Sequence, residues 1–126
     1  MNKLLDTNIV LYLLGDKLEE QLPDGNYNIS VITEIELLSY PALNKTTENN
    51  IKKFLNELAI VELDSAIKEE AIKLRRTHSL KLPDAIIVAT ALIIKAEILT
   101  IDLRLTRIPK LHCKSLKLKE YSTIIE

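Results

Sequence analysis

Residues 83–101 read PDAIIVATALIIKAEILTI and include the most apolar stretch of the chain. Their first part, to about Lys95, is apolar nearly all round at helical spacing, which predicts a central, buried helix. Pro83 suits the first turn of that helix. The second part, 97–101, is a short apolar run typical of a buried strand. A buried helix that leads directly into a buried strand is characteristic of an α/β fold.

Strands and helices alternate in the same way along the rest of the chain. The predicted strands are 3–5, 27–30, 59–63, 97–101 and, more briefly, about 112–116. The predicted helices are about 7–14, 33–39, 46–58, 65–78 and 83–95, with Thr46 or Thr47 and Asp64 or Ser65 as caps of the third and fourth. This order predicts an α/β three-layer sandwich, with a mostly parallel central sheet flanked by helices, as one domain over 1–126.

Composition supports an ordinary folded domain. Of the 126 residues, 47% are hydrophobic and 28% are charged, which is enough apolar material for one core and gives no sign of disorder. Cys113 is the single cysteine, so no internal disulfide forms. The longest mostly apolar run, 85–94, is shorter than the ~20 residues that cross a bilayer. We therefore expect a cytoplasmic protein with no membrane segment.

The net charge of −1 hides an uneven distribution. Residues 1–63 carry 5 Lys/Arg and 10 Asp/Glu, whereas residues 64–126 carry 12 Lys/Arg and 8 Asp/Glu. Six basic residues and no acidic residue lie between Leu103 and Lys119. Such a patch suits a phosphate backbone, although a solvated basic tail explains it equally well.

Four acidic residues mark places where apolar runs stop: Asp6, Glu36, Asp84 and Asp102. Asp6 and Asp102 each follow a predicted strand, and ligands of open parallel sheets bind in the crevice beyond such strand ends. Asp84 and Glu36 lie in early helical turns, which can face the same edge. Glu34 competes with Glu36, because periodicity does not choose between them. The fold alone can therefore bring four carboxylates together.

Each acid also has an ordinary structural explanation. Asp6 would cap the first helix, Asp84 would interact favourably with a helix dipole, and Asp102 would start a turn. Together, however, converging carboxylates repel one another unless a cation lies between them. Mg²⁺ and Mn²⁺ prefer oxygen ligands, and such a site suits phosphodiester hydrolysis by a metal-activated water.

Other chemistries have little support. The chain has only two glycines, so it has no glycine-rich phosphate loop. His112 and Cys113 are adjacent, and a strand would direct them to opposite faces, where they would not bind one zinc ion. His78 lies near a predicted helix end among charges, which favours an exposed position over a role as general base.

The segments around the four acids resemble the motifs of the PIN-domain nucleases, and within them the toxins of VapBC-type toxin–antitoxin systems. The similar segments are, in chain order, LDTN (5–8), SVITEIEL (30–37), LPDAIIVATA (82–91) and LTID (99–102). The second motif selects Glu36 over Glu34. Leu105 and Val88 stand where the family often has Phe and Ala, and both changes are conservative.

This resemblance implies a PIN-like fold and a Mg²⁺- or Mn²⁺-dependent endoribonuclease. The catalytic, metal-binding residues would be Asp6, Glu36, Asp84 and Asp102. Thr7 and Asn8 would orient Asp6, and Thr100 would act near Asp102. The family also implies a homodimer and a cognate antitoxin protein as partners.

Charge and position in the sequence suggest which residues contact RNA. Arg104 and Arg107, just past Asp102, are the candidates for phosphate contacts, with Arg75 and Arg76 as weaker ones. An alternative is a weakly active or inactive PIN module that acts mainly in an antitoxin complex on promoter DNA. A phosphatase with an aspartyl nucleophile is disfavoured, because Asn8 stands where a second Asp is needed.

Overall fold

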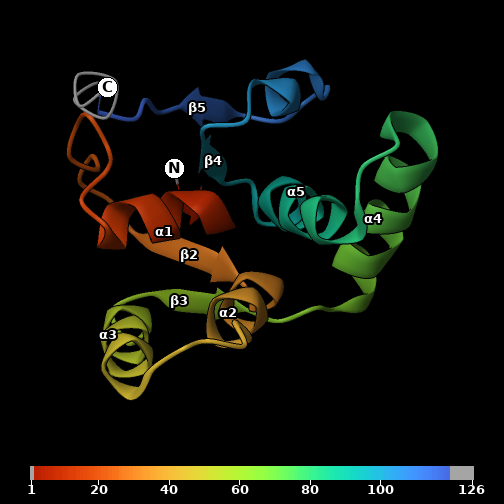
Figure 1. Ribbon diagram of the computed structural model, residues 1–126. Helices are drawn as coiled ribbons and strands as arrows, with labels where there is room; N and C mark the ends of the chain where they lie inside the picture. Colours follow the sequence, from red (N-terminus) through yellow and green to blue (C-terminus); the bar gives the residue numbers. More distant parts are fainter. Residues whose placement is uncertain (1, 120–126) are drawn as a thin grey trace.

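The computed structural model describes residues 2–119, so the predicted domain, 1–126, extends past the described residues at both ends (Figure 1). The strands are β1 (Lys3–Leu5), β2 (Tyr27–Ser30), β3 (Ala59–Val61), β4 (Glu97–Thr100) and β5 (Cys113–Ser115). The helices are α1 (Thr7–Leu14), α2 (Val31–Leu38), α3 (Lys45–Leu55), α4 (Ser65–His78) and α5 (Leu82–Ile94), followed by the short 3₁₀ helix η1 (Leu103–Arg107). The predicted α/β fold is confirmed.

The strands form one sheet in the order β3-β2-β1-β4-β5, and every pairing among them is parallel. Central strand β1 pairs on one side with β2 and on the other with β4, so that Leu4 lies opposite both Asn28 and Ile98. The chain first winds from β1 outward to β3 and then returns to β4. The direction of winding therefore changes between β1 and β4, which is where ligands of open parallel sheets bind.

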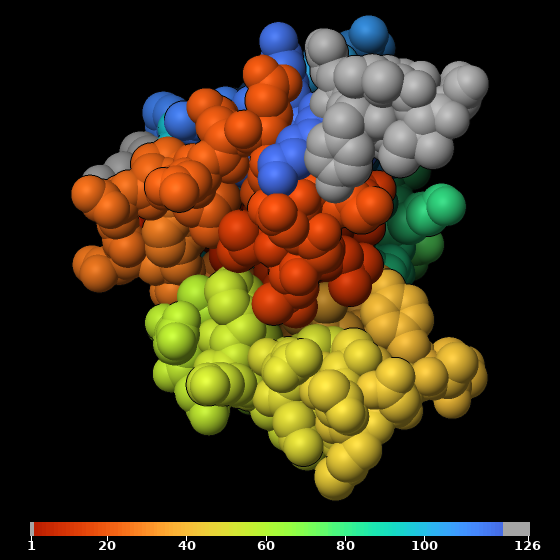
Figure 2. Space-filling view, turned by 60° about the vertical axis from the view of Figure 1, so that its left-hand side comes forward, coloured from red at the N-terminus to blue at the C-terminus, as the bar shows by residue number. Residues whose placement is uncertain are grey.

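Alternation along the central strands builds two cores. Leu4 and Ile98 are fully buried in a cluster with α4 and α5, whereas Leu5 and Leu99 are fully buried in a second cluster with α1, α2 and α3. Neighbouring residues on a strand point to opposite faces, so each central strand contributes to both clusters. Figure 2 shows the second face from outside, with α1 in red and α3 in yellow. The result is the predicted three-layer arrangement.

Helix α5 has the buried environment that its apolar sequence predicts. Its residues 85–91 are all buried, including Thr90, whose hydroxyl donates to the carbonyl oxygen of Ile86 at 2.7 Å. This bond explains how a polar side chain is accommodated inside a nearly apolar helix. The helix ends at Ile94, and its C-cap, Lys95, has a left-handed backbone with φ of 56°.

The boundaries differ from the predictions where a local cap decides them. Helix α2 begins at Val31, two residues earlier than predicted, because the Ser30 hydroxyl accepts a hydrogen bond from the Ile32 amide at 3.1 Å. Neither Thr46 nor Thr47 caps α3; Asn44 does, accepting from the Thr47 amide at 2.8 Å. Helix α3 ends at Leu55 and strand β3 at Val61, both earlier than predicted. The 3₁₀ helix η1 was not predicted.

None of the helices within residues 2–119 is long and apolar enough to span a membrane.

Replacing Leu99 with Ala tests the central strand. The side chain is fully buried in the second cluster, and its loss should lower the free energy of unfolding by about 2–5 kcal/mol, measured by urea denaturation. Leu103→Ala is the matched control: this side chain is 66% exposed, and its loss should change that free energy by less than about 0.5 kcal/mol. Equal effects of the two substitutions would contradict this packing.

Candidate active site

Asp6 lies directly after central strand β1, at the β1–β4 switch point. Its side chain is only 8% exposed and accepts two hydrogen bonds. The Thr7 amide donates to Oδ1 at 2.8 Å, and the Thr100 hydroxyl donates to Oδ2 at 2.7 Å. Burial raises the pKa of Asp6, the charges of Asp84 and Asp102 raise it further, and the two hydrogen bonds oppose this shift.

Thr100 connects Asp6 with Asp102. Its hydroxyl is fully buried at the end of β4 and donates to Asp6, while it accepts a hydrogen bond from the Asp102 amide at 2.9 Å. The Thr100 hydroxyl therefore fixes both the carboxylate of Asp6 and the backbone of Asp102.

Thr7 connects the same strand end with Glu36 of α2. The Thr7 hydroxyl donates to Glu36 Oε1 at 2.8 Å and lies 2.9 Å from the Thr33 hydroxyl. A hydroxyl has one hydrogen to donate, so Thr33 must donate to Thr7. This chain of hydrogen bonds places Glu36, rather than Glu34, next to the segment that carries Asp6.

Asp84 enters the site from the first turn of α5. Pro83 precedes it near the helix start, where the missing amide hydrogen of proline costs nothing. Burial raises the pKa of the half-buried Asp84, and the charge of Asp102 raises it further, while Arg104 and Lys81 oppose the shift. Asp102 thus acts electrostatically on Asp84, and the charge of Asp84 in turn raises the pKa of Asp6.

Asp102 is held by the residue two positions further on. The side chain of Arg104 donates from Nε to Oδ1 at 2.9 Å and from Nη2 to Oδ2 at 2.6 Å, and its backbone amide donates to Oδ1 at 3.0 Å. These bonds lower the pKa of Asp102. Asp102 is thus the N-cap of η1 and also one half of an ion pair.

The chemistry of this donor set fits a hard divalent cation. All four side chains offer carboxylate oxygens. Burial is the main cause of the raised pKa of Asp6, and the negative charges of Asp84 and Asp102 add to it, so a cation at this edge would favour the ionised form. The arrangement is open, however: across residues 2–119, no three Asp, Glu, His or Cys side chains are placed to hold one ion. Glu36 is hydrogen-bonded to Thr7 and Asp102 to Arg104, so the acids lie along one edge of the sheet and their oxygens do not converge on one position.

Basic side chains surround the neighbouring cavity. A pocket of about 330 Å³ is lined by Asp84 together with Lys81, Arg104, Arg107 and the exposed His78. The two arginines are those predicted from charge to contact phosphate. Lys81, which precedes α5, was not among the sequence candidates. It lies three residues before Asp84, outside the basic run at 103–119, and this short spacing is the sequence signal for it.

Two other residues differ from what the sequence suggested. Thr33 was overlooked as part of the site, although it lies three residues before Glu36 and hence on the same side of α2. Asn8 is exposed, and its side chain makes no hydrogen bond within residues 2–119. The groups that hold Asp6 are Thr7 and Thr100, and the role of Asn8 stays a prediction.

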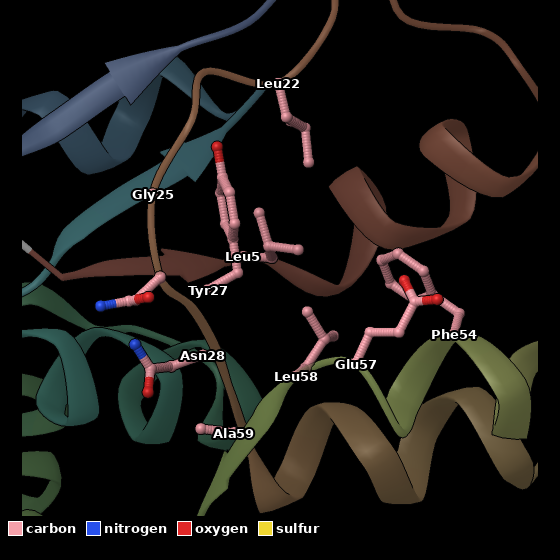
Figure 3. A pocket seen from close by; sticks show the side chains of 10 residues that line it. Leu5, Leu22, Gly25, Tyr27, Asn28, Phe54, Glu57, Leu58 and Ala59 are labelled. Carbon is pink, nitrogen blue, oxygen red and sulfur yellow. The ribbon is translucent and has the colours of Figure 1, made fainter.

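A second cavity lies near the amino ends of β2 and β3 (Figure 3). Its volume is about 440 Å³, and Leu22, Phe54 and Leu58 form much of its apolar wall. None of the four acids lines it. The acidic edge and its basic pocket are therefore the stronger candidate site.

A parallel five-stranded sheet with acidic side chains at its switch point defines a PIN-like α/β domain. The PIN domain family matches residues 3–111. This chain belongs to the PIN domain family.

Solved structures agree with this assignment. A toxin–antitoxin complex from Klebsiella pneumoniae matches with 31% identity and a TM-score of 0.75, covering 90% of this chain and 96% of that one. VapBC2 from Rickettsia felis, bound to a promoter DNA fragment, matches with 20% identity and a TM-score of 0.79 over 93% of this chain and 100% of that one. DNA-bound VapBC from Salmonella typhimurium has 21% identity and a TM-score of 0.79, covering 91% and 98%. No curated protein sequence matches.

Neutralising Asp84 should stabilise the metal-free chain. Its raised pKa means that the folded state holds the proton more tightly than the unfolded state, so ionised Asp84 lowers stability at neutral pH. Asp84→Asn should raise the melting temperature in EDTA at pH 7 by about 2 °C or more. The difference should shrink as the pH falls through the raised pKa of folded Asp84, and it should disappear below the ordinary pKa of an unfolded Asp, where both states are protonated.

Differential scanning calorimetry across this pH range would test the expectation. Asp24→Asn, at an exposed position in the turn before β2, is the matched control and should leave the melting temperature nearly unchanged. If Asp84→Asn melted below the native chain at pH 7, burial and the charge of Asp102 would not be destabilising ionised Asp84.

Proposed function

We propose that this protein is a Mg²⁺- or Mn²⁺-dependent endoribonuclease and the toxin of a type II toxin–antitoxin pair. The observation that carries the proposal is the hydrogen-bonded chain from Asp102 through Thr100 to Asp6, and from the adjacent Thr7 to Glu36. These contacts hold three acids at the switch point, with Asp84 in the same electrostatic field.

The residues that would hold the cation are Asp6, Glu36, Asp84 and Asp102, directly or through water. A bound divalent cation would lower the pKa of a water molecule and neutralise charge on the phosphate. Thr7 and Thr100 keep the Asp6 carboxylate in one orientation, which preorganises the site. Asn8 is proposed to orient water near Asp6 once the site is occupied.

RNA would approach over the basic pocket beside Asp84. Lys81, Arg104 and Arg107 line this pocket and offer cationic contacts to the phosphate backbone. The slightly acidic molecule can therefore attract RNA locally although its net charge is −1.

Partners are proposed from the relatives. The 31% identical structure from Klebsiella pneumoniae is a toxin–antitoxin complex, which supports a cognate antitoxin for this chain. We propose that the active form is a homodimer in the cytoplasm. The alternative, a weakly active module in a DNA-bound antitoxin complex, is supported by the DNA in the Rickettsia and Salmonella complexes.

Glu36→Gln and Glu34→Gln form a matched pair that tests the site. Glu36 accepts from Thr7, so its neutralisation should lower kcat/KM for RNA cleavage by about 10- to 100-fold. Glu34, two residues earlier on α2, has no such contact and its change should leave the rate nearly as it was. The measurement is cleavage of a labelled RNA pool with Mn²⁺, with EDTA abolishing it. Equal losses in both variants would refute the assignment.

Expression in cells separates the enzyme from the binding module. Without a partner, the native chain should arrest growth, and Asp84→Asn should relieve the arrest because the acid that supports cleavage is gone. Circular dichroism and protein level would show that the variant is folded and present. Persistent arrest by the folded variant would favour the module that acts by binding.

A further inference from the structure

Arg104 covers both oxygens of the Asp102 carboxylate. Besides the bonds given above, Nε also lies 3.2 Å from Oδ2, so the guanidinium meets the carboxylate edge to edge. The Arg104 side chain is 74% exposed and that of Asp102 is 24% exposed. The pair therefore forms at the rim of the site, where the arginine can move without repacking the core.

This contact competes directly with a cation. The lone pairs that accept from a guanidinium fork are those that a carboxylate presents to a metal ion. Arginine keeps its charge at any pH that a protein tolerates, so proton loss cannot release Asp102. A divalent ion would also be repelled by the guanidinium. Direct ligation by Asp102 therefore requires Arg104 to move away.

Arg104 also lies within reach of a site for phosphate. Arg104 lines the same basic pocket as Lys81 and Arg107, beside Asp84. A planar guanidinium binds a phosphate in the same two-pronged manner as a carboxylate. An RNA phosphate in that pocket would give Arg104 a new partner as it leaves the old one.

We propose that Arg104 is an internal counter-ion that occupies Asp102 in the metal-free chain and passes to an RNA phosphate when a divalent cation binds. This inference rests on the proposed function and adds a regulatory contact to the same site. Each ligand then raises the affinity for the other. The cation releases Arg104 for a phosphate, and the phosphate draws Arg104 away from the carboxylate of Asp102. Such coupling is reciprocal: whatever factor the cation adds to RNA affinity, RNA adds to cation affinity.

Calorimetric titration with Mn²⁺ alone tests the first half. Arg104→Gln should bind Mn²⁺ about two- to fivefold more tightly than the native chain, because exposed ion pairs are individually weak. Arg104→Lys keeps the charge but loses the fork and should fall between the two. Arg107→Gln removes the same charge three residues on and measures the effect of charge alone. Equal Mn²⁺ affinities for Arg104→Gln and Arg107→Gln would overturn the proposal.

A double-mutant cycle in EDTA tests the second half, with a labelled single-stranded RNA oligonucleotide as the probe. Asp102→Asn frees Arg104 and should tighten RNA binding about two- to fivefold. In the Arg104→Gln background the same change removes a negative charge but frees no arginine, so the gain should be clearly smaller. Equal gains in both backgrounds would overturn the transfer to phosphate.

Failure of this inference is distinguishable from failure of the proposed function. The inference alone is overturned if the native chain binds Mn²⁺ and cleaves RNA, but Arg104→Gln does not tighten Mn²⁺ binding and the double-mutant cycle shows no coupling between Asp102 and Arg104. A chain in which neither the native protein nor any variant binds Mn²⁺ overturns both.

Discussion

A carboxylate buried at the end of the central strand is the constraint on which the rest of the site depends. Asp6 is 8% exposed, and a charge at that depth must be paired or hydrogen-bonded. Its two donors come from different places, the Thr7 amide at the start of α1 and the Thr100 hydroxyl at the end of β4. Satisfying this one group therefore fixes the position of a helix start against a strand end. Thr100 also accepts a hydrogen bond from the Asp102 amide, and the Thr7 hydroxyl donates to Glu36, so the positions of these two acids depend on the same residues.

The ionised acids of the site lower the stability of the folded chain, and the buried apolar clusters on both sides of the sheet offset this cost. Burial and neighbouring carboxylates raise the pKa of Asp6 and of Asp84, which means that the ionised forms destabilise the folded chain. Fully buried Leu4 and Leu5, directly before Asp6, pack into opposite cores and hold the strand end in place. A site that costs stability in this way is common where function needs closely spaced charges.

The topology also brings together the two halves of the chain that differ in charge. The acidic first half contributes Asp6 and Glu36, while the basic second half contributes the other two acids and the basic residues Lys81, Arg104 and Arg107. The return of the chain from β3 to β4 places these halves side by side at the β1–β4 boundary. A basic pocket consequently adjoins an acidic centre, which suits recognition of an anionic backbone next to a site for cations.

The sequence alone predicted the five strands, the five α-helices and three of the four acids, because apolar periodicity and helix caps depend on neighbouring residues. The helix at 83–95 and all five strands were predicted in this way. Choosing Glu36 over Glu34 needed the family resemblance, since apolar periodicity does not choose between them. Only the tertiary structure decided the strand order, the hydrogen bond between Thr33 and Thr7, and the pairing of Arg104 with Asp102. The first two join segments that are far apart in the sequence, which local patterns do not relate. The last depends on which rotamer an exposed arginine adopts beside a carboxylate, and the folded edge of the sheet sets that choice.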